Sequence, residues 1–353
     1  MQNIVSQDIE NIMGTNILWE KWKDKKILVT GATGYLMTYF VKLLIQLNKE
    51  MQMNISVYCL CRSKEKVLQK FGDIYEEPDL NFIYSDICEP FECSKMDIIV
   101  HAASPANPAL WNKYPVETMK ANILGTSLLL EKAVKWETTE FVYISSSSVY
   151  GSAEQEVKLD ENYRGKADFC DYRYAYNLGK QTGELLCKSY EEQFGLKVKI
   201  VRPFIVYGPG MEINQKKAFT DFLFNVLEEK DIVLKSDGHV MRSYCYIADA
   251  ISGIATVMLN GEYGRAYNIA NAKESISILD LAKTFSYISE KENKRKSQIV
   301  FDIPKENQNS YLNSMSDSLL ADTTELERLG WNAAYSLNDG IVRTVKYYKE
   351  EKY

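Results

Sequence analysis

A tyrosine and a lysine four residues apart could form a proton-transfer site in this 353-residue chain. On a helix, Tyr176 and Lys180 share one face, which brings an ammonium close to a phenol. We expect the ammonium to lower the pKa of the phenol from its ordinary value of about 10. A serine hydroxyl from the run Ser145–Ser148 could hold the reacting oxygen. These residues together predict a site where a proton and a hydride are exchanged between an alcohol and a nicotinamide.

The tyrosine–lysine spacing alone is weak support, because the chain has two further matches, Tyr287/Lys291 and Tyr348/Lys352. Both stand in polar, charge-rich surroundings, where we expect solvent-exposed helix faces. Tyr176 alone lies between two predicted core strands and follows the serine run. An ordinary helix residue is the alternative interpretation for it.

A glycine turn lies upstream of this region. Gly31 and Gly34 follow the apolar run that ends at Thr30 and open a helical pattern. Glycines permit a tight turn and close approach of the backbone to a pyrophosphate, whose charge the helix N-terminus favours. The turn therefore predicts a dinucleotide-binding site, with a plain strand-to-helix turn as the alternative.

The end of the second strand bears on which dinucleotide binds. NAD-binding proteins carry an acid there, whereas an arginine nearby accommodates the 2′-phosphate of NADP. Cys61 holds the acid position and Arg62 follows it, so NADP(H) is favoured and NAD remains possible. Arg62 could instead begin a solvated helix. Asp86 and Ile87 could seat the adenine, although Asp86 could equally cap a helix.

The elements that must position these residues alternate between strand-like and helix-like runs. Strands are expected at 26–30, 55–61, 81–84, 97–101, 140–145 and 197–201, and helices at 34–47, 116–136 and 174–194. This alternation predicts an α/β fold with a doubly wound parallel sheet of the Rossmann type. We assign residues 1–25 to an N-terminal extension, 26–203 mainly to a dinucleotide-binding domain and 204–353 mainly to a smaller C-terminal α+β cap that binds substrate.

Composition excludes several other classes of protein. The net charge of −6 and the lack of a dense basic block argue against a nucleic-acid or anionic-membrane partner. No apolar run approaches the ~18–20 residues of a membrane span, and the N-terminus carries acids where a signal peptide is basic, so we expect a soluble cytoplasmic protein. Seven cysteines without a CxxC pair and only two histidines, His101 and His239, predict no metal site.

The motifs in their order resemble the extended short-chain dehydrogenase/reductase family that acts on nucleotide sugars. The resemblance rests on TGATGYL, Asp86-Ile87, HAAS (His101–Ser104), Asn122, SSSSVYG, YNLGK (Tyr176–Lys180), RPFIVYGPGM and MRSYCYIADA, and runs from about Lys26 to Trp331. HAASPANP and the C-terminal half are most similar to the UDP-glucuronate decarboxylase branch.

The resemblance implies a role for each matching position. Ser146, Tyr176 and Lys180 would be catalytic, and Ser146, Ser147 and Arg242 would bind a nucleotide-diphosphate sugar. His101 would be structural and Asn122 would brace the site. The positions implied to contact the cofactor are Gly31, Thr33, Gly34, Tyr35, Leu36, Arg62, Asp86, Ile87, Ala102, Ala103, Ser104, Asn122, Tyr176, Lys180, Pro203 and Val206.

Departures from the family pattern narrow the implied reaction. The 4,6-dehydratases carry Asp and Glu where this chain has Ser147 and Ser148, and the decarboxylases keep the Glu. Ile205 replaces a frequent Asn. The leading hypothesis is therefore NADPH-dependent reduction of a nucleotide-linked 4-keto-6-deoxysugar, as in dTDP-4-dehydro-6-deoxyglucose reductases. An NAD-dependent UDP-sugar 4-epimerase or UDP-glucuronate decarboxylase is the alternative, and a non-catalytic NADP-binding protein a third.

The family resemblance also implies a homodimer packed through the helices at 116–136 and 174–194. Leu124, Leu128, Leu129 and Ala133 repeat at a helical period compatible with such packing, but they could equally face the sheet.

Overall fold

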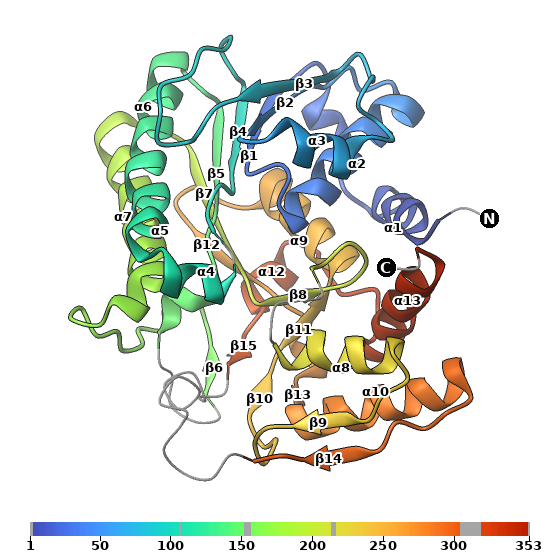
Figure 1. Cartoon of the computed structure of the whole chain (residues 1–353). Helices are drawn as coiled ribbons and strands as arrows, with labels where there is room; N and C mark the ends of the chain where they lie inside the picture. Colours follow the sequence, from blue (N-terminus) through green and yellow to red (C-terminus); the bar gives the residue numbers. More distant parts are fainter. Residues whose placement is uncertain (1–2, 106, 152–156, 213–216, 304–318, 352–353) are drawn as a thin grey trace.

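A parallel seven-stranded sheet covered by helices on both faces forms the centre of the molecule (Figure 1). The computed structural model describes residues 3–105, 107–151, 157–212, 217–303 and 319–351. In spatial order the strands are β12 (Ala266–Ile269), β7 (Val198–Pro203), β5 (Glu140–Ile144), β4 (Ile98–His101), β1 (Lys26–Thr30), β2 (Ser56–Cys61) and β3 (Leu80–Tyr84). The predicted doubly wound α/β fold is confirmed.

Alternation along each strand explains why the strands have continuous apolar runs. In β1, Ile27 and Val29 pack into one hydrophobic cluster while Leu28 packs into the other. The first cluster is covered by α2 (Tyr35–Met51) and α9 (Ile247–Asn260), and the second by α6 (Thr126–Trp136) and α7 (Ala175–Phe194). Because both faces are buried, neither set of alternating positions can be polar.

The helix predicted at 116–136 is observed as three consecutive segments. These are α5 (Pro115–Lys120), a π-helical turn η2 (Ala121–Gly125) and α6. Single π-helical turns inside α-helices occur frequently at functional sites. Here the turn contains Asn122, which is almost completely buried.

Two short helices, α3 (Lys64–Phe71) and α4 (Pro108–Lys113), complete the N-terminal half together with the 3₁₀ turns η1 (Trp19–Trp22), η3 (Ser147–Tyr150) and η4 (Tyr172–Tyr174).

The chain after residue 203 contributes both to the central sheet and to a smaller region below it in Figure 1. β12 pairs with β7 and α9 packs against β7, so these two elements belong to the sheet layer. The smaller region consists of two-stranded sheets and helices. Its elements are β8 (Ile205–Tyr207), α8 (Ala218–Leu227), β9 (Ile232–Leu234), β10 (Met241–Arg242), β11 (Tyr244–Tyr246), η5 (Ala272–Glu274), β13 (Ile276–Ser277), α10 (Ile278–Asn293), β14 (Ile299–Phe301), β15 (Leu320–Ala321, paired with β6, Lys158–Leu159), α12 (Thr324–Arg328) and α13 (Leu337–Glu350).

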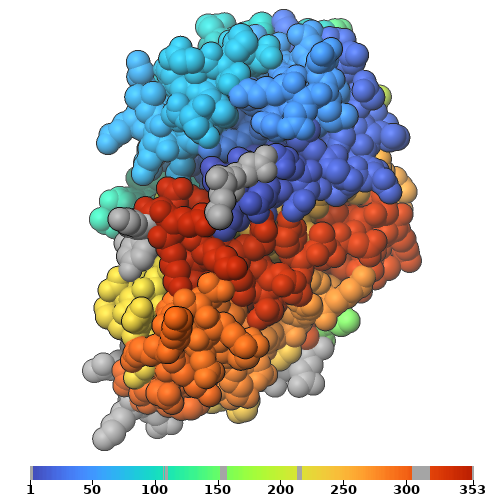
Figure 2. Space-filling model, turned by 90° about the vertical axis from the view of Figure 1, so that its right-hand side faces the viewer, coloured from blue at the N-terminus to red at the C-terminus, as the bar shows by residue number. Residues whose placement is uncertain are grey.

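Residues 3–25 pack onto this body. Helix α1 (Ile4–Met13) contacts α2 and α9, and Ile9 and Ile12 enter the main hydrophobic cluster. Asp8, fully buried, forms an ion pair of 2.7 Å with Arg343 of α13 and accepts a hydrogen bond from the Tyr246 hydroxyl. Figure 2 shows the resulting arrangement, with the C-terminal segment (red) lying against the N-terminal segment (blue).

The strand order fixes where a ligand can bind. Because all seven strands are parallel, their carboxyl ends meet at one edge of the sheet. The chain winds outward in opposite directions from β1 and β4, and the crevice outside the carboxyl ends of such a pair is the usual ligand site of open α/β sheets. Many of the predicted site residues follow the ends of β1, β2, β3, β4 and β5.

Candidate active site

The glycine turn lies directly against the neighbouring strand end. Gly31 has φ +66°, and a Cβ there would lie 2.9 Å from the carbonyl carbon and oxygen of Ala102. Gly34 forms the N-cap of α2, and no side chain caps this helix end. The uncapped amides and the glycine cradle fit the pyrophosphate of a dinucleotide, which would be bound by the amino end of α2 and by the turn.

A buried histidine holds the facing turn in place. The Thr126 hydroxyl donates to the Asn122 carbonyl (2.7 Å), so it accepts from Nε2–H of His101 (3.0 Å). Nδ1 of His101 then accepts from the Thr30 hydroxyl (2.7 Å), whose oxygen accepts the amides of Ala102 and Ala103 (3.2 Å each). Burial lowers the pKa of His101 to about 3. His101 is therefore a neutral structural residue beside the glycine turn.

Two residues at the proposed adenosine end form an ion pair. Arg62 and Asp86 approach to 3.6 Å, with 75% and 41% of their side chains exposed. Asp86 also accepts the amide of Cys88 (2.9 Å), so it stabilises a turn at the same time. Lys64 begins α3, whereas Arg62 precedes the N-cap Ser63 and lies outside the helix. The exposed Arg62 side chain therefore lies at the rim of the candidate site and is not part of α3.

The other cofactor positions lie around the same edge. The thiol of Cys61 is buried and accepts a backbone hydrogen bond from Thr33, which joins the glycine turn to the end of β2. Ile87 is buried, and a Cβ at Gly125 would lie 2.9 Å from its Cγ2. Tyr35 and Leu36 begin α2, and the Tyr35 hydroxyl is buried next to Gly208, where a Cβ would lie 3.1 Å from it.

Lys180 is buried between α7 and β5. Its ammonium donates to the Ile144 carbonyl (2.7 Å) and lies 4.8 Å from the centre of the Tyr143 ring. Burial lowers the pKa of Lys180 to about 7, although the Glu184 carboxylate acts in the opposite direction. This lysine is consequently divided between its neutral and charged forms near neutral pH.

The expected lowering of the Tyr176 pKa is wrong. Burial raises the pKa of Tyr176 to about 12, and the hydrogen bond with Ser146 opposes this shift only in part. The Lys180 ammonium lies 6.0 Å from the ring centre, donates to Ile144 and is itself desolvated. The phenol is therefore protonated at neutral pH.

A tryptophan that sequence reasoning missed covers Tyr176. The rings of Trp111 and Tyr176 stack with 3.9 Å between their centres and 3° between their planes. The indole N–H of Trp111 donates to the Pro105 carbonyl (2.7 Å), which fixes the ring. No local pattern marks this residue, because the contact joins positions 65 apart in the chain. The only available signal was its place between the HAAS turn and Asn122.

The hydroxyls of the serine run differ in their surroundings. Ser145 donates to Glu184 (2.6 Å), which forms a two-pronged ion pair with Arg202 (2.9 and 2.6 Å). Ser146 caps η3 by accepting the Ser148 amide (3.1 Å), and its hydroxyl contacts Tyr176. Ser147 is buried, and the Ser148 hydroxyl is buried with no hydrogen-bond partner among the described residues. Ser146 is therefore the hydroxyl placed at the phenol.

The remaining predicted residues lie on both sides of this centre. Asn122 donates to the Thr118 carbonyl (2.8 Å) and packs against Gly179 of α7. A Cβ at position 179 would lie 3.1 Å from the Cβ of Asn122. Ala103 and Ser104 are half-buried in the turn after β4. Pro203 ends β7 and Val206 lies in β8. Arg242 lies in β10 of the smaller region, and its guanidinium donates to the Met241 carbonyl (2.9 Å).

The two other tyrosine–lysine matches differ from each other. Tyr287 is exposed with the Lys291 ammonium 5.4 Å from its ring centre, as expected. The expectation of a solvent-exposed face is wrong for Tyr348, which is buried because α13 packs onto the body and its hydroxyl donates to the Met211 carbonyl. Lys352 lies outside the described residues.

Comparison with known proteins identifies the family. Residues 27–270 match the NAD dependent epimerase/dehydratase family. The chain belongs to this family. Its relatives include UDP-glucuronic acid decarboxylase 6 of Arabidopsis thaliana, which is 30% identical over 73% of each chain. UDP-glucuronic acid decarboxylase 1 of Xenopus tropicalis is 25% identical over 99% of this chain and 78% of its own.

Solved structures of family members agree with the fold. The UDP-glucuronic acid 4-epimerase of Bacillus cereus, solved in complex with UDP-glucuronic acid and NAD, superposes with a TM-score of 0.75. It is 26% identical, and the match covers 92% of this chain and 99% of that one. Among the residues that the structure describes, the present chain has no helix long and apolar enough to cross a membrane. The same residues contain no group of three His, Cys, Asp or Glu side chains placed as metal ligands would be.

The buried ammonium gives a prediction for stability. Because Lys180 has a folded-state pKa of about 7 against an ordinary 10.5, burying its charge costs stability below pH 7 and nothing above about pH 10.5. Wild type should therefore gain stability relative to Lys180→Met as the pH rises from 7 to 10, at about 1.4 kcal/mol per unit. Urea unfolding at several pH values measures the difference. Lys188→Met, on an exposed turn of α7, is the control. If the difference in unfolding free energy between wild type and Lys180→Met does not change with pH, the Lys180 charge is not buried.

Proposed function

We propose that this protein reduces a nucleotide-linked 4-keto-6-deoxysugar, of the dTDP-4-dehydro-6-deoxyglucose kind, with NADPH. The product would be a precursor for a surface polysaccharide, made in the cytoplasm. Family membership supports a nucleotide-sugar substrate, since relatives are named for acting on UDP-glucuronic acid and a neighbouring structure contains it together with NAD. The choice of reduction within the family rests on the residues of the site.

The observation that carries the proposal is the pair of hydroxyls at positions 147 and 148. Ser147 and Ser148 stand where the resemblance places the carboxylates that eliminate water in 4,6-dehydratases. Glu184, the carboxylate that accepts a hydrogen bond from Ser145, is neutralised by its ion pair with Arg202. Glu184 is therefore a structural residue and a poor base. A reaction that needs only hydride and proton transfer at one carbon fits these side chains best.

The protonation states support the direction of reduction. Tyr176, protonated at neutral pH, donates its proton to the oxygen of the ketone as that oxygen becomes an alkoxide. Ser146 donates a hydrogen bond to the same oxygen. Lys180 supplies N–H donors to the ribose hydroxyls of the cofactor and a positive charge when protonated. A nicotinamide cofactor, when bound, supplies the hydride.

The alternative activity is that of an NAD-dependent UDP-sugar 4-epimerase or UDP-glucuronate decarboxylase. The names of the relatives favour it, and the hydroxyls at 147 and 148 oppose it. An epimerase or decarboxylase regenerates its cofactor in each cycle and retains it, whereas a reductase releases it. Denaturing the purified protein and identifying the released nucleotide therefore distinguishes the two.

The first prediction concerns turnover. Purified protein should oxidise NADPH when dTDP-4-dehydro-6-deoxyglucose is added, as measured by the loss of NADPH absorbance. Tyr176→Phe should lower kcat by about 10²–10⁴-fold, because it removes the proton donor and leaves the ring stack with Trp111. Tyr287→Phe, at the exposed match with the same spacing, should leave kcat unchanged.

Two outcomes would contradict the reductase assignment. One is tightly retained NAD⁺ together with conversion of UDP-glucuronic acid to an epimer or to carbon dioxide and a UDP-pentose. The other is full activity of Tyr176→Phe, which would remove the tyrosine from the chemistry. If no nucleotide sugar is turned over while NADP still binds, the non-catalytic hypothesis replaces both enzymes.

The second prediction concerns cofactor choice. Arg62 extends from the rim beside Asp86, where its fork can bind the 2′-phosphate of NADPH. Arg62→Ala should raise KM for NADPH by about tenfold, equivalent to about 1.4 kcal/mol, and leave KM for NADH within about twofold. Lys66→Ala, an exposed lysine on α3, is the matched control. A wild-type preference for NADH, or an equal effect on both cofactors, would contradict this role.

We also propose that the protein is a homodimer through α5, η2 and α7. Exposed apolar side chains gather on these elements, namely Val116, Met119, Leu124 and Leu185. Leu129 and Ala133 instead face the sheet in the second hydrophobic cluster, so only part of the periodic set is available to a partner. A large exposed apolar surface on one helical layer is typical of a subunit interface.

The dimer proposal predicts a change in mass. Leu185→Glu places a charge on the exposed apolar surface, so sedimentation should shift from dimer to monomer at micromolar concentration. Leu68→Glu, which changes an exposed leucine on α3, should remain dimeric. A monomeric wild type, or a dimer unaffected by Leu185→Glu, rules out this interface.

A further inference from the structure

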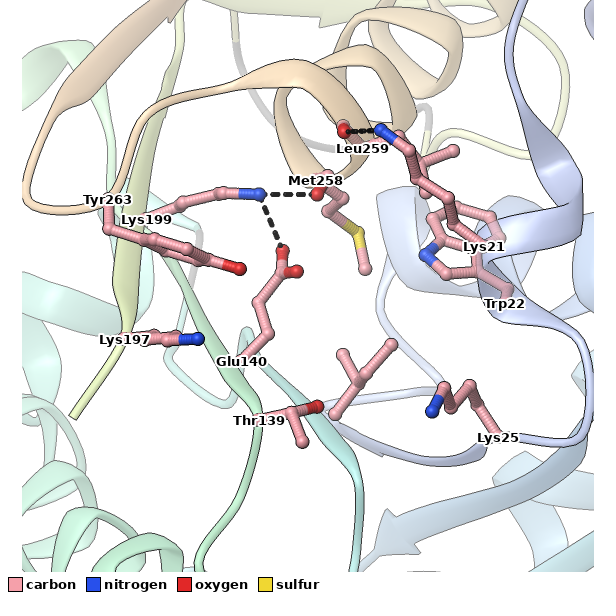
Figure 3. A pocket seen from close by; sticks show the side chains of 11 residues that line it. Lys21, Trp22, Lys25, Thr139, Glu140, Lys197, Lys199, Met258, Leu259 and Tyr263 are labelled. Atoms are coloured by element: carbon pink, nitrogen blue, oxygen red, sulfur yellow. Dashed lines mark hydrogen bonds and ion pairs between the residues drawn. The ribbon is translucent and has the colours of Figure 1, made fainter.

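A pocket opens at the edge of the sheet opposite the candidate active site (Figure 3). Its volume is about 360 Å³, within the size range of small-molecule sites. Its walls come from the starts of β4, β5 and β7, from η1 and from the end of α9. The polar groups that line it are Lys21, Trp22, Lys25, Thr139, Glu140, Lys197, Lys199 and Tyr263.

The pocket is positively charged in a protein that is negative overall. Four lysines line it against one glutamate, while the whole chain carries −6. Figure 3 shows the ammoniums of Lys25 and Lys197 pointing into the pocket from opposite sides, with the hydroxyls of Thr139 and Tyr263 between them. A concave site with ammoniums on facing walls favours an anion.

Two of the lysines already have structural partners. Lys199, almost fully buried, donates to the Met258 carbonyl and pairs with Glu140 (3.3 Å), and Lys21 donates to the Leu259 carbonyl (2.7 Å). Both therefore satisfy carbonyls at the carboxyl end of α9. This role does not extend to Lys25 or to Lys197, whose ammonium lies 5.4 Å from the Tyr263 ring centre. The charge of the pocket exceeds what the helix end requires.

The pocket is also lined by a buried polar atom with no hydrogen-bond partner in the described residues, the indole N–H of Trp22, a residue 1% exposed. The neighbouring carboxylate of Glu140, a residue 8% exposed, is held by its ion pair with Lys199 at 3.3 Å. Leaving a buried donor unpaired is costly, so the Trp22 N–H indicates a bound group that accepts a hydrogen bond from it beside the Glu140 carboxylate.

We propose that this pocket binds a phosphate monoester of a small polyhydroxy compound. The phosphate lies between Lys25 and Lys197, where the charge exceeds the structural need. Hydroxyl groups lie deeper, because a hydroxyl can accept from the Trp22 N–H and donate to the Glu140 carboxylate. The site is distinct from the dinucleotide site, since Glu140 begins β5 whereas Ser145 and Ser146 follow its end.

Calorimetric titration of the full-length protein tests the proposal. NADP and UDP are added in saturating amounts, so that the active-site crevice is occupied. Glucose 6-phosphate, inorganic phosphate and glucose are then titrated separately. We expect saturable binding of glucose 6-phosphate, weaker binding of phosphate and none of glucose. Lys25→Gln/Lys197→Gln should weaken the binding of glucose 6-phosphate at least tenfold, and Trp22→Phe should weaken glucose 6-phosphate more than phosphate.

Matched controls separate this site from general charge effects. Lys135→Gln/Lys291→Gln removes two exposed lysines elsewhere and should leave binding unchanged. The affinity for NADP should be the same in every variant, which reports on folding and on the first site. The proposal is wrong if neither phosphate compound binds saturably, if glucose binds as well as glucose 6-phosphate, or if both double variants weaken binding equally.

Discussion

The buried ion pair between Glu184 and Arg202 fixes the geometry on which the candidate site depends. It joins α7 to β7, and Glu184 also accepts the hydroxyl of Ser145 at the end of β5. Arg202 further donates to the Tyr150 hydroxyl (3.1 Å), which donates to Asn268 of β12 (2.6 Å). These hydrogen bonds and the ion pair thereby connect the neighbouring strands β5, β7 and β12 to α7. Removing one partner of such a pair leaves an uncompensated buried charge, which costs about 3–5 kcal/mol.

That anchor determines the chemistry of the tyrosine–lysine pair. With α7 held against β5, the Lys180 side chain is buried between them, where its ammonium donates to the Ile144 carbonyl. Desolvation then acts on both groups in the direction of their neutral forms, lowering the pKa of Lys180 and raising that of Tyr176. A neutral phenol under the Trp111 ring is able to donate a proton, as the proposed reduction requires.

Local patterns predicted the fold and the glycine turn, because both depend on neighbours in the sequence. β1 has the predicted bounds, and Gly31 adopts the positive φ that only a glycine tolerates easily beside Ala102. The stack of Trp111 on Tyr176 and the pair of Glu184 with Arg202 could not be predicted, since each depends on how distant elements pack. The predicted direction of the Tyr176 pKa shift was wrong for a related reason. Spacing reveals the nearby charge, but only the packed structure reveals the loss of water.

The two edges of the sheet differ electrostatically for one reason. In a parallel α/β layer the helices run opposite to the strands, so their amino ends lie at the carboxyl edge of the sheet and their carboxyl ends at the amino edge. At the first edge, the amino end of α2 is the proposed phosphate site, and a helix N-terminus favours an anion without the help of lysines. At the second, the carboxyl end of α9 requires cations, and Lys21 and Lys199 supply them. Lysines are therefore expected at the amino edge as part of the fold. The helix dipole does not account for the remaining charge of Lys25 and Lys197 beside the unpaired indole N–H of Trp22. This excess is what distinguishes the proposed ligand site from a capped helix end.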